Sequence, residues 1–293
     1  MAGGFWQRVL ESEMAVPSDR PLPDLTVELV TMLGSVSPIE RDEIAFPVLA
    51  TWLHHGVYDD LLVSFGDSIC TGLRVGLGEG GTDTVFRRSF SALTLAACLE
   101  RDNAAHLLPI DTVMSWAEKA IGWFTREEDL RGYVPGKGWA HTVAHGADLV
   151  GALAQSRHLD ASQLGVLLDV IAERVTSSTS TVLVDGEDDR LALATLAALQ
   201  RNLVETPTLD SWVESMAECL GRIGGAGEQP GPTAAARNCS RFLRALYVHL
   251  SIGVSPHGLS GFKEAPQCRA DLLLSLLSVI PRHTPWLYAD GDR

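Results

Sequence analysis

The sequence contains few cysteines, and they form no recognisable pattern. An odd total of five with no C-x-x-C pair fits neither a disulfide framework nor a structural zinc knot, so we expect reduced thiols, as in a cytoplasm. Long apolar runs are also missing. The stretch "MAGGFWQRVLESEM" lacks the apolar core of a signal peptide, and no segment reaches the ~20 uncharged apolar residues that span a bilayer. The sequence therefore predicts a cytoplasmic protein without a membrane partner.

Positive charge is scarce as well. The chain has 23 lysines and arginines against 37 aspartates and glutamates, a formal net charge of −14, which repels phosphate backbones, so we expect no nucleic-acid partner. The G-x-S-x-G and P-loop signatures are missing, which removes the usual support for a serine hydrolase or a P-loop NTPase. The stretch "GLGEGG" at 76–81 fits G-x-G-x-x-G, but no βαβ pattern surrounds it, and we interpret it as a loop before a helix.

What the sequence does contain is helical periodicity. Apolar residues recur at helical spacing between short stretches of Gly, Pro and Asp, so the fold class is predicted to be all-α. Five apolar segments can be laid over one another and start 46 to 54 residues apart: 42–53, 88–99, 142–153, 189–200 and 239–250. Either they are repeats, or they are amphipathic helices that resemble one another by chance.

A period of about 40 to 47 residues is typical of HEAT or armadillo repeats, whose paired helices stack into a superhelix. The expected architecture is therefore a HEAT/armadillo-like α-solenoid of about five helical pairs, forming a single domain over residues 1–293. Gly and Pro accumulate at about 221–236, where we expect a flexible insertion.

Polar residues recur where these segments begin. In a solenoid, one helix of each pair lines the concave side, so these positions would share one edge of the groove. Aspartate in the first turn of a helix is explained by capping and by the helix dipole, whereas arginine is not. The row therefore either faces a ligand or is paired internally. Its members are Arg41, Asp42, Arg87, Arg88, His141, Asp188, Asp189, Arg190, Asn238 and Arg241.

The stretch "RGYVPGKGWAHTVAHGAD" at 131–148 is the strongest candidate for a site. If residues 139–154 form a helix, His141, His145 and Asp148 lie within roughly 60° of one another, opposite the apolar stripe, and face solvent or the groove. Three interpretations are open: a shared divalent metal such as zinc, although the H-E-x-x-H glutamate is missing; a metal-free site in which one histidine is the acid or base and Asp148 orients its ring; and structural hydrogen bonding.

The loop before this predicted helix adds two cations. Glycines around Pro135 allow a tight backbone path, and Lys137 and Arg131 would lie near free N–H groups at a helix start, which suits a carboxylate or a phosphate. In the alternative, the glycines serve turn geometry only, and the cations pair with the "REED" segment at 126–129.

Three stretches, in this order and spacing, resemble a bacterial family described as domain of unknown function 2785. They are "RSFSAL" at 88–93, "RGYVPGKGWAHTVAHGADLV" at 131–150 and "DDRLALA" at 188–194. The resemblance extends over most of the chain and implies a HEAT-like helical fold, but no particular activity. Its signature positions map onto Arg88, Ser89, Arg131, Lys137, Trp139, His141, His145, Asp148 and Arg190.

Two functions of different class follow. In the first, the chain is an enzyme that acts on a small anionic molecule: His141, His145 and Asp148 supply acid–base or metal chemistry, and the substrate is held by Arg88, Arg131, Lys137, Trp139 and Arg190. In the second, a non-catalytic solenoid binds a protein or peptide partner along its concave side. A peptide groove would show exposed aromatic side chains or a charge stripe of one sign. Neither is evident in the sequence, which favours the enzyme.

Overall fold

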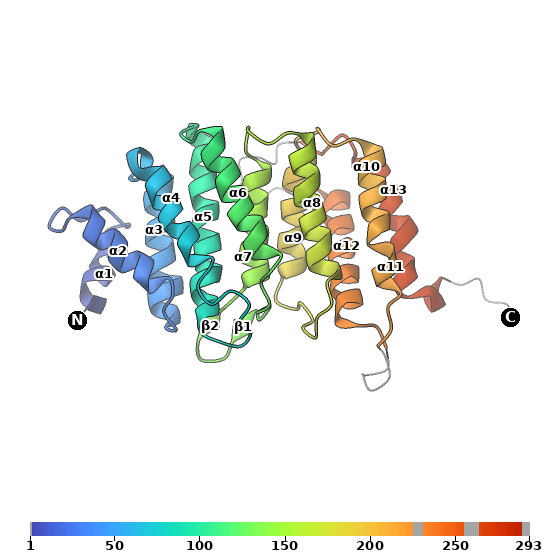
Figure 1. Cartoon of the computed structure of the whole chain (residues 1–293), viewed down its shortest axis with the longest axis horizontal. Coiled ribbons are helices and arrows are strands. Elements are labelled where there is room, and N and C mark those ends of the chain that lie inside the picture. The colour runs from blue at the N-terminus through green and yellow to red at the C-terminus, as the bar shows by residue number, and fades with distance from the viewer. Residues whose placement is uncertain (1, 225–230, 255–263, 289–293) are drawn as a thin grey trace. The chain divides into compact units, whose positions relative to one another are not determined.

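The computed structural model describes residues 2–224, 231–254 and 264–288. These residues form helices joined by short connections, together with one short β-hairpin, so the predicted all-α class is confirmed (Figure 1). The chain divides into two compact units, Met1–His158 and Leu159–Arg293, and each unit is described by itself. None of the helices in these ranges is both long and apolar enough to cross a membrane.

The first unit contains seven α-helices and the hairpin. Its elements are α1 (Ala2–Glu11), α2 (Leu22–Met32), a π-helical turn (Ile39–Ala45), α3 (Phe46–His54), a 3₁₀ turn (Asp59–Leu61), α4 (Leu62–Gly72), α5 (Thr84–Ala105), α6 (Ile110–Phe124), β1 (Tyr133–Val134), β2 (Gly138–Trp139) and α7 (Thr142–Ala154).

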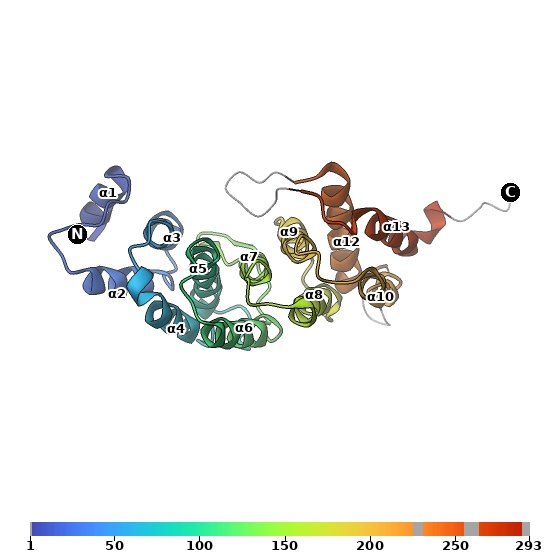
Figure 2. The ribbon, with the colours of Figure 1, turned by 90° about the horizontal axis from the view of Figure 1, so that it is seen from above.

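These helices pack in two rows. Helix α5 lies between α3 and α7 in one row, and α4 and α6 form the other row, so each helix contacts the next but one along the chain (Figure 2). Helices approach closely at two glycines, one between α4 and α6 of the same row and one between α6 and α7 of different rows. A side chain at Gly66 would collide with the Trp116 ring, and one at Gly146 would collide with Phe124. The core between the rows is filled with large apolar side chains, among them Trp52, Trp116, Trp123 and Phe124.

The second unit repeats this plan. Its elements are α8 (Ala161–Thr176), α9 (Glu187–Leu199), α10 (Thr206–Ser215), α11 (Ala217–Leu220), α12 (Ala234–Ile252), α13 (Arg269–Val279) and two 3₁₀ turns (Ile280–His283 and Pro285–Leu287). Helices α9, α12 and α13 follow one another in contact, and α8 and α10 pack beside them. Sequence signals start two of these helices: Asp160 and Gln163 form a capping box for α8, and Thr233 caps α12.

All five segments that the apolar pattern aligned lie in helices, namely α3 with the turn before it, α5, α7, α9 and α12. The predicted insertion at 221–236 is described only in part, because residues 225–230 lie outside the described residues. On either side of that stretch the chain is paired: Ile223 forms an antiparallel bridge with Pro232, and the Gly224 N–H donates to Gly231 O at 2.9 Å.

Candidate functional site

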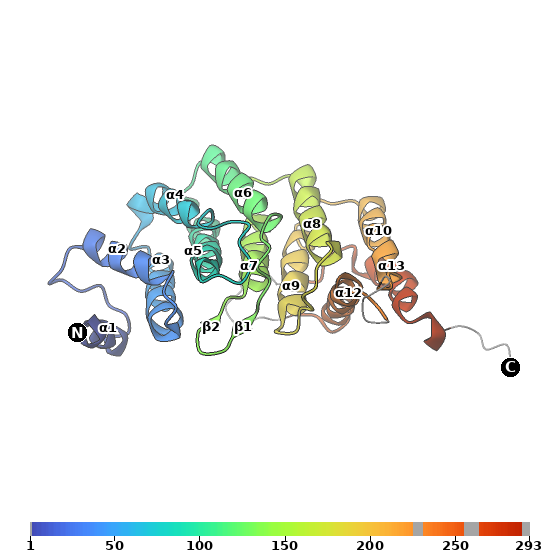
Figure 3. The same cartoon turned by 60° about the horizontal axis from the view of Figure 1, so that its bottom comes forward.

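The predicted helix over 139–154 starts three residues later than expected. Strand β1 pairs antiparallel with β2, so Trp139 lies in a hairpin opposite Tyr133, and α7 begins at Thr142 (Figure 3). The glycines explain the difference. Gly136 and Gly138 have φ of 75° and 80°, values that favour glycine and turn the chain back. His141, the residue before α7, also has a left-handed backbone conformation, with φ of 51°. It therefore lies outside the helix, and the helical angle of roughly 60° predicted among His141, His145 and Asp148 was wrong.

Arg88 is fully buried and has internal partners. Its Nε and Nη2 donate to the Glu127 carboxylate at 2.5 and 2.8 Å, and its Nη1 donates to the carbonyls of Val75 and Gly76 at 2.9 and 2.8 Å. Glu127 also accepts from Trp123 Nε1 at 2.9 Å. The glycine-rich stretch 76–81 is therefore a loop that closes over a buried guanidinium, and Arg88 presents no free face to a ligand.

Arg131 and Lys137 also have carboxylate partners. Arg131 Nε and Nη2 donate to Asp129 at 2.7 and 2.6 Å, and these bonds raise the pKa of its guanidinium. Lys137 Nζ lies 2.6 Å from one oxygen of Asp83 and 2.8 Å from the other. Pairing with the "REED" segment thus holds for Arg131, and Glu127 of the same segment binds Arg88 instead of Lys137. The basic side chains of this unit that were predicted to hold an anion are all engaged with acidic side chains.

Arg41 fixes the hairpin to the start of α3. Its guanidinium is fully buried, lies 4.1 Å from the centre of the Phe86 ring, and donates to Lys137 O at 2.7 Å. It also pairs with Asp42 at 2.7 Å, and the Asp42 carboxylate accepts the Trp139 N–H. Burial lowers the pKa of Arg41 and raises that of Asp42. The start of α3 therefore holds the second half of the hairpin, at Lys137 and Trp139.

The polar row of the second unit is paired internally as well. Asp188 on α9 pairs with Arg241 on α12 at 3.1 Å, and Asp189 accepts from His249 Nε2 at 2.9 Å. Asn238 is buried, and its side-chain Oδ1 accepts a hydrogen bond from the Leu183 backbone N–H. Asp188 and Asp189 at the start of α9 are thus paired internally, whereas Arg241 lies inside α12, which begins at Ala234, and not at a helix start as predicted.

The prediction that His145 faces solvent or the groove is wrong. His145 is only 6 % exposed, its Nδ1 is 2.8 Å from Ser89 Oγ, and its ring meets the Phe90 ring edge-on at 4.9 Å. The reason is the position of α7, which packs against both α5 and α6, so that most of its circumference is covered. Ser89 and Phe90 belong to "RSFSAL", and the structure thereby joins two of the three motifs.

His141 lies half-buried between the hairpin and His145. Its ring stacks on Trp139 with a centroid distance of 4.2 Å and an interplanar angle of 28°, and it meets His145 edge-on at 5.8 Å. Trp139 in turn contacts Tyr133 at 5.0 Å. We call the series Tyr133, Trp139, His141, His145 and Phe90 the ring ladder. It runs from a side chain that is 54 % exposed to one that is 3 % exposed.

The other two predicted site residues, Asp148 and Arg190, are not part of the ring ladder. Asp148 is half-buried on α7, and Arg190 is half-buried on α9 of the second unit. The donor atoms of His141, His145 and Asp148, all described residues, do not come within 4.8 Å of one another as a set. A metal held by this trio would therefore require side-chain rotations.

Sequence reasoning missed Tyr133, which is the most exposed ring of the ladder. Its signal was present: Tyr133 and Trp139 flank a Gly-rich turn at a spacing that places them opposite each other once a hairpin is assumed. It also missed Asp83, because an acidic partner 54 residues before Lys137 leaves no local trace.

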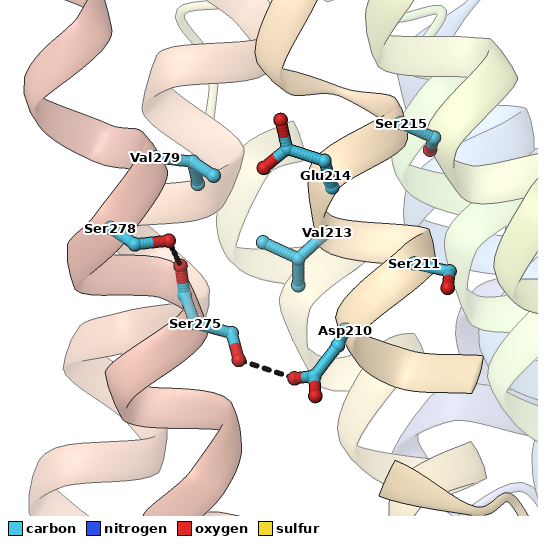
Figure 4. Close-up of a pocket in the computed structure, with 8 residues that line it drawn as sticks. All are labelled: Asp210, Ser211, Val213, Glu214, Ser215, Ser275, Ser278 and Val279. Atoms are coloured by element: carbon cyan, nitrogen blue, oxygen red, sulfur yellow. Dashed lines mark hydrogen bonds between the residues drawn. The ribbon is translucent and has the colours of Figure 1, made fainter. Parts of the chain in front are cut away.

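A separate cavity of about 620 Å³ lies in the second unit between α10 and α13 (Figure 4). Four serines, Val213, Val279 and the carboxylates of Asp210 and Glu214 line it. Asp210 accepts from Ser275 Oγ, and Glu214 pairs with Arg282 at 2.6 Å. Both acidic side chains of this cavity already have partners, so it is a weaker candidate than the hairpin.

The structure defines a helical protein with an aromatic β-hairpin just before α7, and this hairpin is held by Arg41, Asp42 and Asp83. The sequence profile of a family described as protein of unknown function DUF2785 matches residues 73–248. The chain belongs to this family, and the match includes the hairpin, the ring ladder and the Arg88–Glu127 pair. No curated protein and no solved structure matches the chain.

Proposed function

We propose that the chain is a non-catalytic helical-repeat protein that binds a protein or peptide partner through the exposed rings of Tyr133 and Trp139. The observation that carries the proposal is this pair of adjacent aromatic side chains, 54 % and 38 % exposed, on a rigidly held hairpin. Exposed aromatic side chains are what a peptide-binding surface needs, because Tyr and Trp contribute a large share of binding energy at protein interfaces.

The way the hairpin is held supports a binding role. Its turn is fixed by the Lys137–Asp83 pair and by the bond from Arg41 to Lys137 O, and the backbone N–H of Trp139 donates to the Asp42 carboxylate. Binding then costs little ordering of the hairpin, since its geometry is set before the partner arrives. The net charge of −14 adds a preference for partners that carry basic residues beside an apolar anchor.

The helix packing supports a HEAT-like solenoid, which is a common scaffold for partner binding. In the first unit α5 contacts α3 and α7, and α4 contacts α6; in the second unit α8 contacts α10, and α9 contacts α12, as expected for stacked helical pairs. The five aligned segments all belong to the set α3, α5, α7, α9 and α12, one helix per proposed pair. We therefore propose that the two units are successive parts of one α-solenoid of about five pairs.

Selection from a random peptide library tests the binding function. Peptides are selected on the full chain, and their dissociation constants are measured for wild type, for Trp139→Ala and for Tyr133→Ala. Loss of an anchor at a hot spot costs about 2 kcal/mol or more, so we expect Kd to rise roughly 30-fold for Trp139→Ala. The matched control is Trp286→Ala, which removes a tryptophan that is 75 % exposed in the second unit.

The binding proposal fails if the library yields no enriched peptide. It also fails if the enriched peptides bind Trp139→Ala and Tyr133→Ala as tightly as wild type. Far-UV circular dichroism of each variant shows whether the fold is intact, and we expect it to be, because both side chains lie largely at the surface.

A second candidate, acid–base catalysis on a small anionic molecule, is favoured by one specific contact. The bond between Ser89 Oγ and His145 Nδ1 orients the imidazole, and His141 lies between it and the surface. NMR titration of the histidines in wild type and in His141→Ala with His145→Ala, with the bound metals measured on the same samples, tests this candidate. If the double variant keeps full stability and no metal or ligand response disappears, the catalytic candidate is refuted.

A further inference from the structure

Two cysteines in the second unit lie next to each other. Cys219 lies in the short helix α11, Cys239 lies in the second turn of α12, and these helices pack together. Both side chains are almost fully buried, and the two residues meet at one carbonyl: Met216 O accepts the Cys219 N–H at 3.1 Å and lies 3.7 Å from Cys239 Sγ. Each sulfur is also near a backbone carbonyl: Cys219 Sγ is 3.9 Å from Thr176 O, and Cys239 Sγ is 3.7 Å from Met216 O.

A cation accompanies this pair. Arg222 Nη1 donates to Thr176 O at 3.2 Å, the same carbonyl that Cys219 approaches, so the guanidinium lies beside the thiol. The hydrogen bond from Cys239 and the charge of Arg222 lower the pKa of Cys219 to about 7. The same hydrogen bond, together with burial, raises the pKa of Cys239. One thiol of the pair is therefore ready to ionise, and the other keeps its proton.

The first unit contains a contrasting pair. Cys70 on α4 and Cys98 on α5 are also free and buried, and α4 packs on α5. Here burial dominates: it raises the pKa of Cys70 to about 12 and that of Cys98 well above the usual thiol value. Buried thiols in apolar surroundings are chemically inert, so this pair is an internal reference for the first one.

We propose that Cys219 and Cys239 are a redox-active dithiol, a modification site at which hydrogen peroxide forms a disulfide between α11 and α12. In the first step the Cys219 thiolate attacks one oxygen of peroxide, the O–O bond breaks, and the leaving hydroxide takes a proton to become water. In the second step the Cys239 sulfur attacks the resulting sulfenic acid, the S–S bond forms, the S–O bond breaks, and the Cys239 proton leaves with the oxygen as a second water. Both electrons lost by the thiols reduce the peroxide.

Cys219 is buried but lies close in the chain to the molecular surface. The chain reaches the surface directly after α11, where Gly221, Arg222 and Ile223 are exposed. Helix α11 has only four residues, and the proposal requires its C-terminal end to open far enough for a molecule of the size of peroxide. Larger disulfide reagents would need a larger opening, which is why peroxide is the oxidant in the proposal.

Peptide mapping of the full chain tests the proposal. The protein is treated with a small excess of hydrogen peroxide, the remaining thiols are blocked with N-ethylmaleimide in denaturant, and the sample is digested with trypsin. Trypsin cleaves after Arg222 and Arg237, so the two cysteines fall on different peptides. We expect one species in which these peptides are linked, about 2 Da lighter than their sum, while Cys70, Cys98 and Cys268 carry the maleimide.

Three variants separate the proposal from nonspecific oxidation. Cys239→Ala should give no linked species and should leave Cys219 as a sulfenic acid that a 1,3-dione traps. Arg222→Gln should slow the linkage by roughly twofold to tenfold below pH 7, because less Cys219 is ionised. The matched control Cys98→Ala should form the link at the wild-type rate.

Two results would overturn the proposal. One is that all five cysteines of wild type remain available to maleimide after peroxide treatment. The other is that Cys70 and Cys98 become linked as fast as Cys219 and Cys239. If Cys239→Ala fails to fold by circular dichroism, the wild-type map and the Cys98→Ala control still decide between these outcomes.

Discussion

Replacing Glu127 with glutamine removes the charge that balances Arg88 while keeping the size of the side chain. Both members of this ion pair are buried, at 0 % and 3 % exposure, and two N–H groups of Arg88 point at the carboxylate. A glutamine would offer one acceptor and turn an NH₂ group toward the other donor. Removing one partner of a buried pair costs about 3 to 5 kcal/mol, because the remaining charge stays buried without compensation. We expect Glu127→Gln to lower the free energy of unfolding by about 3 kcal/mol, near the lower end of this range.

The matched control is an exposed pair with the same two-pronged geometry. Arg101 Nε and Nη2 donate to Asp59 at 2.8 and 2.6 Å, but the two side chains are 23 % and 30 % exposed. Solvent screening reduces the value of such a pair to about 0.2 to 1 kcal/mol, so Asp59→Asn should have a small effect. The two pairs share charge type and the two-pronged geometry and differ in burial, and Glu127 additionally accepts from Trp123 Nε1.

Urea unfolding followed by circular dichroism measures both variants. With a slope of roughly 1 to 3 kcal/mol per molar urea, a loss of 3 kcal/mol lowers the midpoint by about 1 to 3 M. Hydrogen exchange should also rise in the loop at 76–84, whose carbonyls accept from Arg88. The reasoning is refuted if Glu127→Gln shifts the midpoint no more than Asp59→Asn does. It is also refuted if exchange in the loop stays unchanged.

Three further predictions concern stability. Burial raises the pKa of Tyr58 to about 12, so the protonated phenol stabilises the fold fully below pH 10, and this stabilisation, roughly 2 to 3 kcal/mol in all, is lost as pH rises from 10 toward 12. The urea midpoint should therefore fall less between pH 9 and pH 11 in Tyr58→Phe than in wild type. Gly146→Ala should lower the melting temperature through a loss of about 1 to 3 kcal/mol, because its methyl group meets Phe124, whereas Gly165→Ala in open space on α8 should gain about 0.4 to 1 kcal/mol; equal signs for the two would contradict this. Asp160→Ala removes the cap of α8 and should cost about 1 kcal/mol in the same melting experiment, and no change would show that the capping box is not needed.

The part of the site that could be predicted was the part encoded by local spacing. Arginine at a helix start has no local explanation, so the row was predicted either to face a ligand or to be paired internally; Arg88 lies inside α5 and is paired internally with Glu127. The acidic "REED" segment was one of two alternatives for the cations, and it supplies the partners of Arg88 and Arg131. The partner of Lys137 could not be predicted, because Asp83 reaches it only after the hairpin folds back over the start of α5.

The sequence by itself determined the all-α class and the five aligned helices, because apolar residues at helical spacing must be buried on one side whatever surrounds them. It also marked the stretch from Arg131 to Asp148 as unusual, through glycines, cations and histidines close together. Only the tertiary structure decided which side chains of that stretch are available. Packing of α7 against α5 and α6 buried His145, and long-range pairing neutralised the cations. What remained at the surface was the edge of the hairpin with Tyr133 and Trp139, since exposure depends on every neighbour and not on the spacing along one helix.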